Sequence, residues 1–303
     1  MPCRAVPEKH WPQAARFAWM RGVTDQDPPA LLDRLESYYD AVPRNGARAE
    51  DFGPLSLFVR EGAGWPFYAR PALGWSGPVE AADVHRVRSR QRELGVPEAF
   101  EWVAETTPAL RAAVEASGLT VHEHPLLALD AAAPTPPSGP SADLSGDLPD
   151  GPAVRILGPA DPALAGAVAV PHLAFAEPGT AIGAAGPAEL ADTIRTCARD
   201  GLVARAAERI EAGLTVYAAA VADGTAHCTG QHQPVGEVSE IVGVGTLPSE
   251  RRRGLGLAVT AALVADARAR GVRTVFLSAS DDEVARLYGR LGFRRVGTAL
   301  IAE

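Results

Sequence analysis

An apolar segment that runs into an arginine-rich turn with two glycines restricts the fold of this chain more than any other feature. The segment is EIVGVGTLPSERRRGLG, residues 240–256. It predicts a strand, a turn and a helix start, where Gly254 and Gly256 let the main chain approach a ligand closely. Unpaired N–H groups at a helix start favour an anion such as pyrophosphate, and Arg251–Arg253 add positive charge. A solvated arginine turn before an ordinary helix fits the same local pattern, so this segment alone leaves both interpretations open.

Strands and helices alternate around this segment. Asp223-Gly224 predicts a hairpin turn, and Gly271 and Gly292 each follow an expected helix. The pattern predicts an α+β fold, an α/β mixed sheet flanked by helices. Strands are expected at 153–157, 214–221, 226–233, 240–247, 274–278 and 293–301, and helices at 162–176, 187–212 (one or two), 255–270 and 282–291.

A proline-rich stretch divides the chain. Residues 131–152 contain six prolines and only two large apolar residues, and all five tryptophans lie before them. Such a composition is typical of a linker. The sequence therefore predicts two domains, 1–130 and 153–303, joined by residues 131–152.

A weak internal repeat relates the two halves. Gly95-Val96-Pro97-Glu98-Ala99-Phe100 resembles Gly271-Val272-Arg273-Thr274-Val275-Phe276, and Gly118-Leu119 resembles Gly292-Phe293, at offsets of 176 and 174 residues. In each half a helix is expected between the two matches. A structural duplication explains both matches, although an Ala- and Gly-rich chain could produce them by chance.

Two motifs in the C-terminal half resemble the GNAT superfamily of acyl-CoA-dependent N-acyltransferases. Arg251-Arg252-Arg253-Gly254-Leu255-Gly256 fits the family's pyrophosphate loop, [Q/R]-x-x-G-x-[G/A], and Leu287-Tyr288-Gly289-Arg290-Leu291-Gly292-Phe293 fits L-Y-x-x-x-G-F. The resemblance covers about residues 153–303. It implies two tandem GNAT-like domains, each a central mixed sheet flanked by helices.

The resemblance also implies how acetyl-CoA binds. The cofactor is expected between two splayed parallel strands, 240–247 and 274–278, where main-chain groups pair with pantetheine as an added strand pairs with a sheet edge. The side chain of Arg253 is expected near the phosphates. Where the family usually has Asn, this chain has Asp281, so an amide contact there is in doubt. The expected pantetheine contacts are Val244 and Thr246, and the expected pyrophosphate N–H donors are Arg251, Arg252, Gly254, Gly256 and Leu257.

Direct attack by an amine needs a base for the ammonium proton and an acid for the leaving thiolate. The resemblance places Tyr288 as the acid, because a phenol stays protonated at pH 7. It places Glu240, thirteen residues before Arg253, as the base. A core tyrosine and a carboxylate that solvates the strand edge are the alternatives. Lesser candidates are His227, His232 and Glu237 for the base, and Cys228 as a nucleophile without a motif that supplies its own base.

The N-terminal half lacks the motifs of its counterpart. Aligned on Gly95 and Gly271, Trp75-Ser76-Gly77-Pro78 falls where residues 251–254 stand, so the charge and one N–H are lost. Aligned on Gly118 and Gly292, Val114 replaces the tyrosine. We expect a degenerate domain that does not bind CoA in the usual way. Its aromatic residues either wall the acceptor site or only build the core: Trp65, Phe67, Tyr68 and Trp75.

Composition excludes several function classes. The net charge of −8 is spread over both halves, which argues against a nucleic-acid partner. Three distant cysteines predict neither a disulfide framework nor a metal site. The first ten residues contain three charged side chains and no long apolar run follows, so we expect a cytoplasmic protein without a membrane partner. We also expect a monomer or homodimer. The almost complete absence of lysine indicates a GC-rich genome and hence a bacterium.

The sequence thus predicts an acetyltransferase that moves an acetyl group from acetyl-CoA to an amine of a small molecule or peptide in a ternary complex. Two alternatives remain open at this point. One is a non-catalytic regulator that binds acyl-CoA, and the other is an acyltransferase for a longer acyl chain.

Overall fold

The N-terminal half begins with a long helix and continues as strands with two helices packed on them. The computed structural model describes residues 28–62, 64, 66–129 and 151–303. The elements of this half are α1 (Pro28–Ala41), a 3-10 turn (Pro43–Asn45), β1 (Ala47–Asp51), β2 (Leu55–Arg60), β3 (Ala69–Pro71), α2 (Ala81–Leu94), β4 (Phe100–Val103), α3 (Leu110–Ala116) and β5 (Val121–Leu129).

The C-terminal half follows the predicted order of strands and helices. The strands expected at 153–157 and 274–278 have those bounds, and the hairpin turns at Asp223 and Gly224, with φ values of 49° and 74°. The elements are β6 (Ala153–Leu157), α4 (Leu164–Ala176), α5 (Pro187–Arg199), α6 (Leu202–Glu211), β7 (Val216–Ala222), β8 (Thr225–Val235), β9 (Val238–Thr246), a 3-10 turn (Pro248–Glu250), α7 (Leu255–Ala269), β10 (Thr274–Ser278), α8 (Asp282–Gly289) and β11 (Phe293–Ala302).

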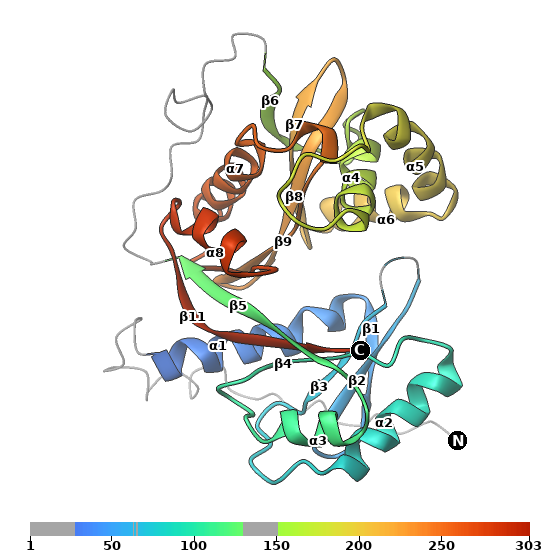
Figure 1. The fold of residues 1–303 in the computed structure, drawn as a ribbon, viewed down its shortest axis with the longest axis vertical. Coiled ribbons are helices and arrows are strands. Elements are labelled where there is room, and N and C mark those ends of the chain that lie inside the picture. Colours follow the sequence, from blue (N-terminus) through green and yellow to red (C-terminus); the bar gives the residue numbers. More distant parts are fainter. Residues whose placement is uncertain (1–27, 63, 65, 130–150) are drawn as a thin grey trace, which may run out of the picture.

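The eleven strands in the described part of the chain form one mixed sheet that runs through both halves (Figure 1). Their order is β1-β2-β3-β4-β11-β5-β10-β9-β8-β7-β6. The sheet is flanked by helices, as predicted. The linker proposed at 131–152 lies almost entirely outside the described residues, which resume at 151.

The two halves exchange their last strands. β5, from the N-terminal half, pairs antiparallel with β10 and β11, and β11, from the C-terminal half, pairs antiparallel with β4. Figure 1 shows β5 and β11 running side by side between the halves. β5 alternates between two cores: Leu126 and Ala128 pack with α1, whereas Leu127 and Leu129 pack with α7. Each half is therefore completed by a strand of the other.

The predicted repeat is visible in this arrangement. Gly95 follows α2 and Gly271 follows α7, both with positive φ, and the same holds for Gly118 after α3 and Gly292 after α8. In each half a parallel pair, β3 with β4 or β9 with β10, lies beside the exchanged strands. The halves are thus two copies of one plan, and the chain is a tandem protein.

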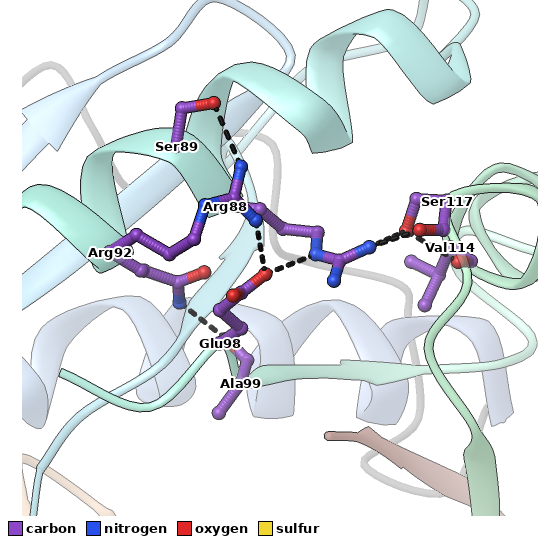
Figure 2. A network of polar contacts seen from close by, with 8 residues as sticks. Arg88, Ser89, Arg92, Glu98, Ala99, Val114 and Ser117 are labelled. Atoms are coloured by element: carbon purple, nitrogen blue, oxygen red, sulfur yellow. Dashed lines mark hydrogen bonds and ion pairs between the residues drawn. The ribbon is translucent and has the colours of Figure 1, made fainter.

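A polar network holds α2 in the N-terminal half (Figure 2). Arg88, on α2, binds the carboxylate of Glu98 before β4 and the carbonyl of Ser117 after α3. Nη1 of Arg92 donates to Oε2 of Glu98 at 2.9 Å. These charge-assisted bonds tie one helix to the two elements that follow it.

Candidate functional site

The parallel strands β9 and β10 separate in the middle of the sheet. They pair over three positions only, the last being Glu240 opposite Phe276. Beyond it β9 continues to Thr246 through a bulge opposite β8, with a φ of 64° at Gly243. A bulge bends its strand and increases the local twist. The V-shaped opening expected between these strands is therefore present.

The turn after β9 brings the start of α7 to this opening. Gly254 precedes the first helical residue with a φ of 76°, a conformation that a residue with a Cβ adopts only under strain. No side chain in the described part of the chain caps this helix start. Its N–H groups are left to water or to a ligand, and the helix dipole favours an anion there.

A cleft of about 470 Å³ lies at this helix start. Its walls come from the end of α4 and the residues after it, from β9 and the following turn, and from α8. The lining includes all eight residues for which a cofactor contact was predicted: Val244, Thr246, Arg251, Arg252, Arg253, Gly254, Gly256 and Leu257.

The side chain of Arg251 closes one wall of the cleft. Its Nη2 donates to the carbonyls of Ala174 at 2.8 Å and Glu177 at 2.5 Å, and its Nη1 donates to the carbonyl of Ala181 at 3.1 Å. These carbonyls belong to the end of α4 and the loop after it. Sequence reasoning gave Arg251 only a main-chain role and missed this one, because the partners lie about 75 residues earlier and carry no motif.

Glu240 lies where the two strands part, on the face of the sheet covered by α1. The hydroxyl of Tyr39 donates to Oε1 of Glu240 at 3.2 Å, and the hydroxyl of Tyr38 accepts the N–H of Glu240 at 3.1 Å. Burial, together with the negative charge of Glu101, raises the pKa of Glu240 to about 8. Burial likewise raises the pKa of Glu101 to about 7. Both carboxyl groups therefore titrate near neutral pH.

Tyr288 lies on the opposite face, against the core under α7. Its ring packs edge-on against Phe293 with centroids 6.1 Å apart. Burial raises the pKa of its phenol well above 10, although a hydrogen bond with Thr260 opposes the shift. Two neighbours on α8, Val284 and Leu287, line the cleft. Tyr288 thus remains protonated at pH 7, beside the cleft rather than in its lining.

Comparison with known proteins identifies this arrangement. Residues 224–300 match the FR47-like protein family. The fold matches a GCN5-related N-acetyltransferase from Kribbella flavida with a TM-score of 0.62, at 22% identity over 90% of this chain and 95% of that one. The molecule therefore has the fold of the GNAT acetyltransferases.

Other solved GNAT structures share the fold of the whole molecule. One is a GCN5-related N-acetyltransferase-like protein from Streptococcus suis, with a TM-score of 0.51, 14% identity, and coverage of 90% of this chain and 98% of that one. Another is a tandem GNAT protein from the clavulanic acid biosynthesis pathway, with a TM-score of 0.50, 17% identity, and coverage of 82% and 77%. No curated protein sequence matches this chain.

The lesser catalytic candidates lie in other surroundings. His232 is fully buried between Ser239 and Asp266, with both nitrogens 2.9 Å from their partners. Glu237 sits in the turn before β9 and pairs with Arg273 at 3.2 Å. That end of the strand is paired with β10, and the cleft opens at the other end.

Two further candidates lie closer to the cleft. Nδ1 of His227 is 3.5 Å from Oε2 of Glu250, a residue of the lining. Cys228 is buried, accepts the hydroxyl of Thr246 at 3.2 Å, and has its pKa raised by burial to about 12. A thiol with that pKa supplies almost no thiolate at pH 7, which disfavours covalent catalysis by Cys228.

The other residues singled out from the sequence have structural contacts. Asp281 caps α8 by accepting the N–H of Val284 at 2.8 Å. Nε1 of Trp75 donates to the carbonyl of Pro78 before α2, and about half of this side chain is exposed. Tyr68 is partly buried near Arg70, Glu101 and Glu240. Trp65 lies outside the described residues.

Two kinds of feature are absent from residues 28–62, 64, 66–129 and 151–303: a metal-ligand cluster and a membrane-spanning helix. No three His, Cys, Asp or Glu side chains in these ranges gather as metal ligands would. None of the helices there combines the length and apolarity that crossing a bilayer requires. Cys197 and Cys228 are buried and free, and Cys3 lies outside these ranges.

Proposed function

We propose that this GNAT protein transfers an acetyl group from acetyl-CoA to an amine of a small molecule or peptide by direct attack in a ternary complex. The observation that carries the proposal is the uncapped start of α7, which faces the opening between β9 and β10. A linear donor with a diphosphate at one end and a thioester at the other fits an opening of this kind.

The donor is held mainly by the main chain. The edge of β9 at Val244 and Thr246 pairs with the pantetheine amides, as an added strand would. The pyrophosphate is bound by the N–H groups of Arg251, Arg252, Gly254, Gly256 and Leu257, and the two glycines keep side chains out of the way. Arg252 and Arg253 supply positive charge at the same place.

Two side chains move the protons. The acetyl thioester supplies an electrophilic carbonyl carbon, which the neutral amine attacks while the C–S bond breaks. Glu240 takes the proton that the ammonium must lose, and Tyr288 gives its hydroxyl proton to the leaving thiolate. The two groups lie on opposite faces of the sheet, so they would reach the reacting carbon from opposite sides. A carboxylate with a pKa near 8 is a better base toward an ammonium than an ordinary glutamate.

The division of the chain is part of the proposal. Residues 153–303 are the catalytic domain, residues 1–130 are a degenerate domain, and residues 131–152 join them, with β5 and β11 exchanged between the domains. A cytoplasmic location, a bacterial origin and a monomeric or homodimeric state remain predictions from the sequence.

A melting series tests the proposal without knowledge of the acceptor. A ligand at about 100 times its Kd stabilises a protein by roughly 2.7 kcal/mol. We expect acetyl-CoA and CoA to raise the Tm of the wild type, and acyl-CoAs with longer chains to do so less. A preference for long chains would favour the longer-chain alternative. Acetyl-CoA binding without acetylation of any amine in a broad panel would favour the regulator. No stabilisation by any acyl-CoA would contradict the proposal.

A further inference from the structure

Arginines from both halves meet beside α6. Arg205 and Arg209 are one turn apart on this helix, so they share a face, and Arg60 ends β2. A Cβ built on Gly46 would lie 3.0 Å from Nη2 of Arg205 and 3.7 Å from Nη1 of Arg60. The two guanidinium groups therefore come together over a glycine. Figure 1 shows the loop after β2 rising toward α6 at this place.

Two more glycines lie beside these guanidinium groups. A Cβ on Gly62 would lie 3.8 Å from Nη1 of Arg205, and a Cβ on Gly64 would lie 3.1 Å from Nη1 of Arg60. The guanidinium of Arg60 stacks on the ring of Phe67, 4.0 Å from its centroid. The ring of Phe67 and three positions without side chains thus leave room for the guanidinium groups of Arg60 and Arg205 where the two halves meet.

This gathering of like charges is costly. Burial, together with the charges of Arg209 and Arg205, lowers the pKa of Arg60 to about 10. Burial and Arg205 also lower the pKa of Arg209. Nε of Arg205 is buried without a hydrogen-bond partner among the described residues. Such a cost is offset when an anion binds between the cations.

Tyr38 links this arginine cluster to the candidate base. Its hydroxyl accepts the N–H of Glu240, and its phenol also feels the charge of Arg209. The positive charge of Arg209 therefore reaches the side chain that is bonded to the main chain of Glu240.

We propose that Arg60, Arg205 and Arg209 bind an oxyanion carried by the acceptor, so that the substrate is an amine with a carboxylate or phosphate group. The guanidinium fork matches the oxygen pairs of both anions. The assignment of the anion to the acceptor rests on the proposed function. The anion site itself does not.

Inorganic phosphate tests the site directly. We expect it to raise the Tm of the Gly254→Pro variant, in which the turn at residues 251–257 is disabled, and to do so much less when Arg205→Gln or Arg209→Gln is added to that variant. Arg195→Gln, at an exposed arginine on α5, is the matched control and should leave the response of Gly254→Pro unchanged. Without phosphate, Arg205→Gln should melt no lower than the wild type, because it relieves repulsion. Equal stabilisation of Gly254→Pro with and without Arg205→Gln would overturn the site, as would no response of Gly254→Pro.

Matched acceptors test the substrate class. We expect amino acids and phosphate-bearing amines to be acetylated with a kcat/KM ~10- to 100-fold above that of their uncharged amide or ester counterparts. The ratio should shrink in Arg205→Gln and persist in Arg195→Gln. A wild type that acetylates amides as well as acids would overturn the acceptor assignment. If no amine is acetylated while phosphate still binds at the arginines, the proposed function fails and the anion site stands.

Discussion

The helices α2 and α7 occupy equivalent places in the two halves, yet their first turns are built for different purposes. In α2, Glu80 and Asp83 form a capping box, and Oδ2 of Asp83 accepts the N–H of Glu80 at 2.8 Å. In α7, Gly254 offers no side chain and arginines precede it. The carboxylates of the chain itself occupy the positive end of the first helix, whereas the second leaves its positive end open to an external anion.

The bodies of the two helices differ as well. α2 is held by the Arg88 and Glu98 network of Figure 2, whereas Val264, at the matching place in α7, is buried in an apolar core. The N-terminal half has kept the plan and filled its ligand end with its own polar groups. A few residues at one helix start therefore decide whether this fold caps the helix itself or leaves its start open.

The largest effect is expected where the open helix start is closed. Gly254→Pro removes an N–H and adds a ring at a position with a φ of 76°, which proline cannot adopt. We expect acetyl-CoA binding to be lost in calorimetry. Ala81→Pro, at the first residue of α2, is the matched control: proline is tolerated there, and CoA affinity should not change. Unchanged affinity in Gly254→Pro would refute the pyrophosphate assignment.

Glu240→Gln should lower kcat/KM by about 10²- to 10⁴-fold, because the base is lost. In the wild type, kcat/KM should rise with pH through about 8 as the carboxyl group ionises, and this limb should vanish in the variant. The control is Glu237→Gln, at an exposed carboxylate in the turn between β8 and β9, and it should behave as the wild type does. A variant that keeps the wild-type rate would exclude Glu240 as the base.

Tyr288→Phe should lower kcat by about 10²-fold and leave CoA affinity within a few-fold, because the proton donor is removed and the ring stays packed. The corresponding residue of the N-terminal half, Val114, is fully buried in the core and can donate no proton. Steady-state kinetics beside calorimetry would separate the two effects. Full activity would remove Tyr288 from the mechanism.

Glu101→Gln tests whether the N-terminal half tunes the base. The charge of Glu101 raises the pKa of Glu240, so its removal should shift the rising limb of the kcat/KM profile to lower pH. Glu115→Gln, exposed on α3, should leave the limb in place. An unshifted limb in Glu101→Gln would mean that the N-terminal half supports the sheet without tuning Glu240.

The smallest effect concerns the capped helix. Asp83→Ala should cost about 1 kcal/mol of the free energy of unfolding, because it removes one side of the capping box. It should not create a second CoA site, since Pro78 and the missing arginines still separate this turn from its counterpart. Denaturant unfolding measures the first expectation. A second equivalent of bound CoA would show that capping alone silences the N-terminal half.

Local patterns in the sequence were enough for the elements and the cleft. The spacing of apolar residues, the turn residues and two motifs predicted β9, α7 and α8. All eight residues expected to contact the cofactor line one cleft. The exchange of β5 and β11 was not predicted, because strand pairing over more than 160 residues leaves no local signal. Leu126 and Leu127 point into different cores, but in the sequence they are only part of an apolar run. An apolar run of this kind fits any interior strand.

The contribution of the N-terminal half to the site was also out of reach. Tyr39 and Glu101 affect Glu240 only because α1 and β4 are folded against the other half. The arginines beside α6 meet for the same reason. Such clusters depend on long-range packing, whereas the pyrophosphate turn is a continuous segment of the chain.

Calorimetric titration of the whole chain with acetyl-CoA is the most direct test of the open helix start as a cofactor site. We expect one molecule bound per chain, with binding lost in Gly254→Pro and kept in Ala81→Pro. Two molecules per chain would show that the capped half also binds the donor. No binding would contradict the assignment of the open helix start as a cofactor site.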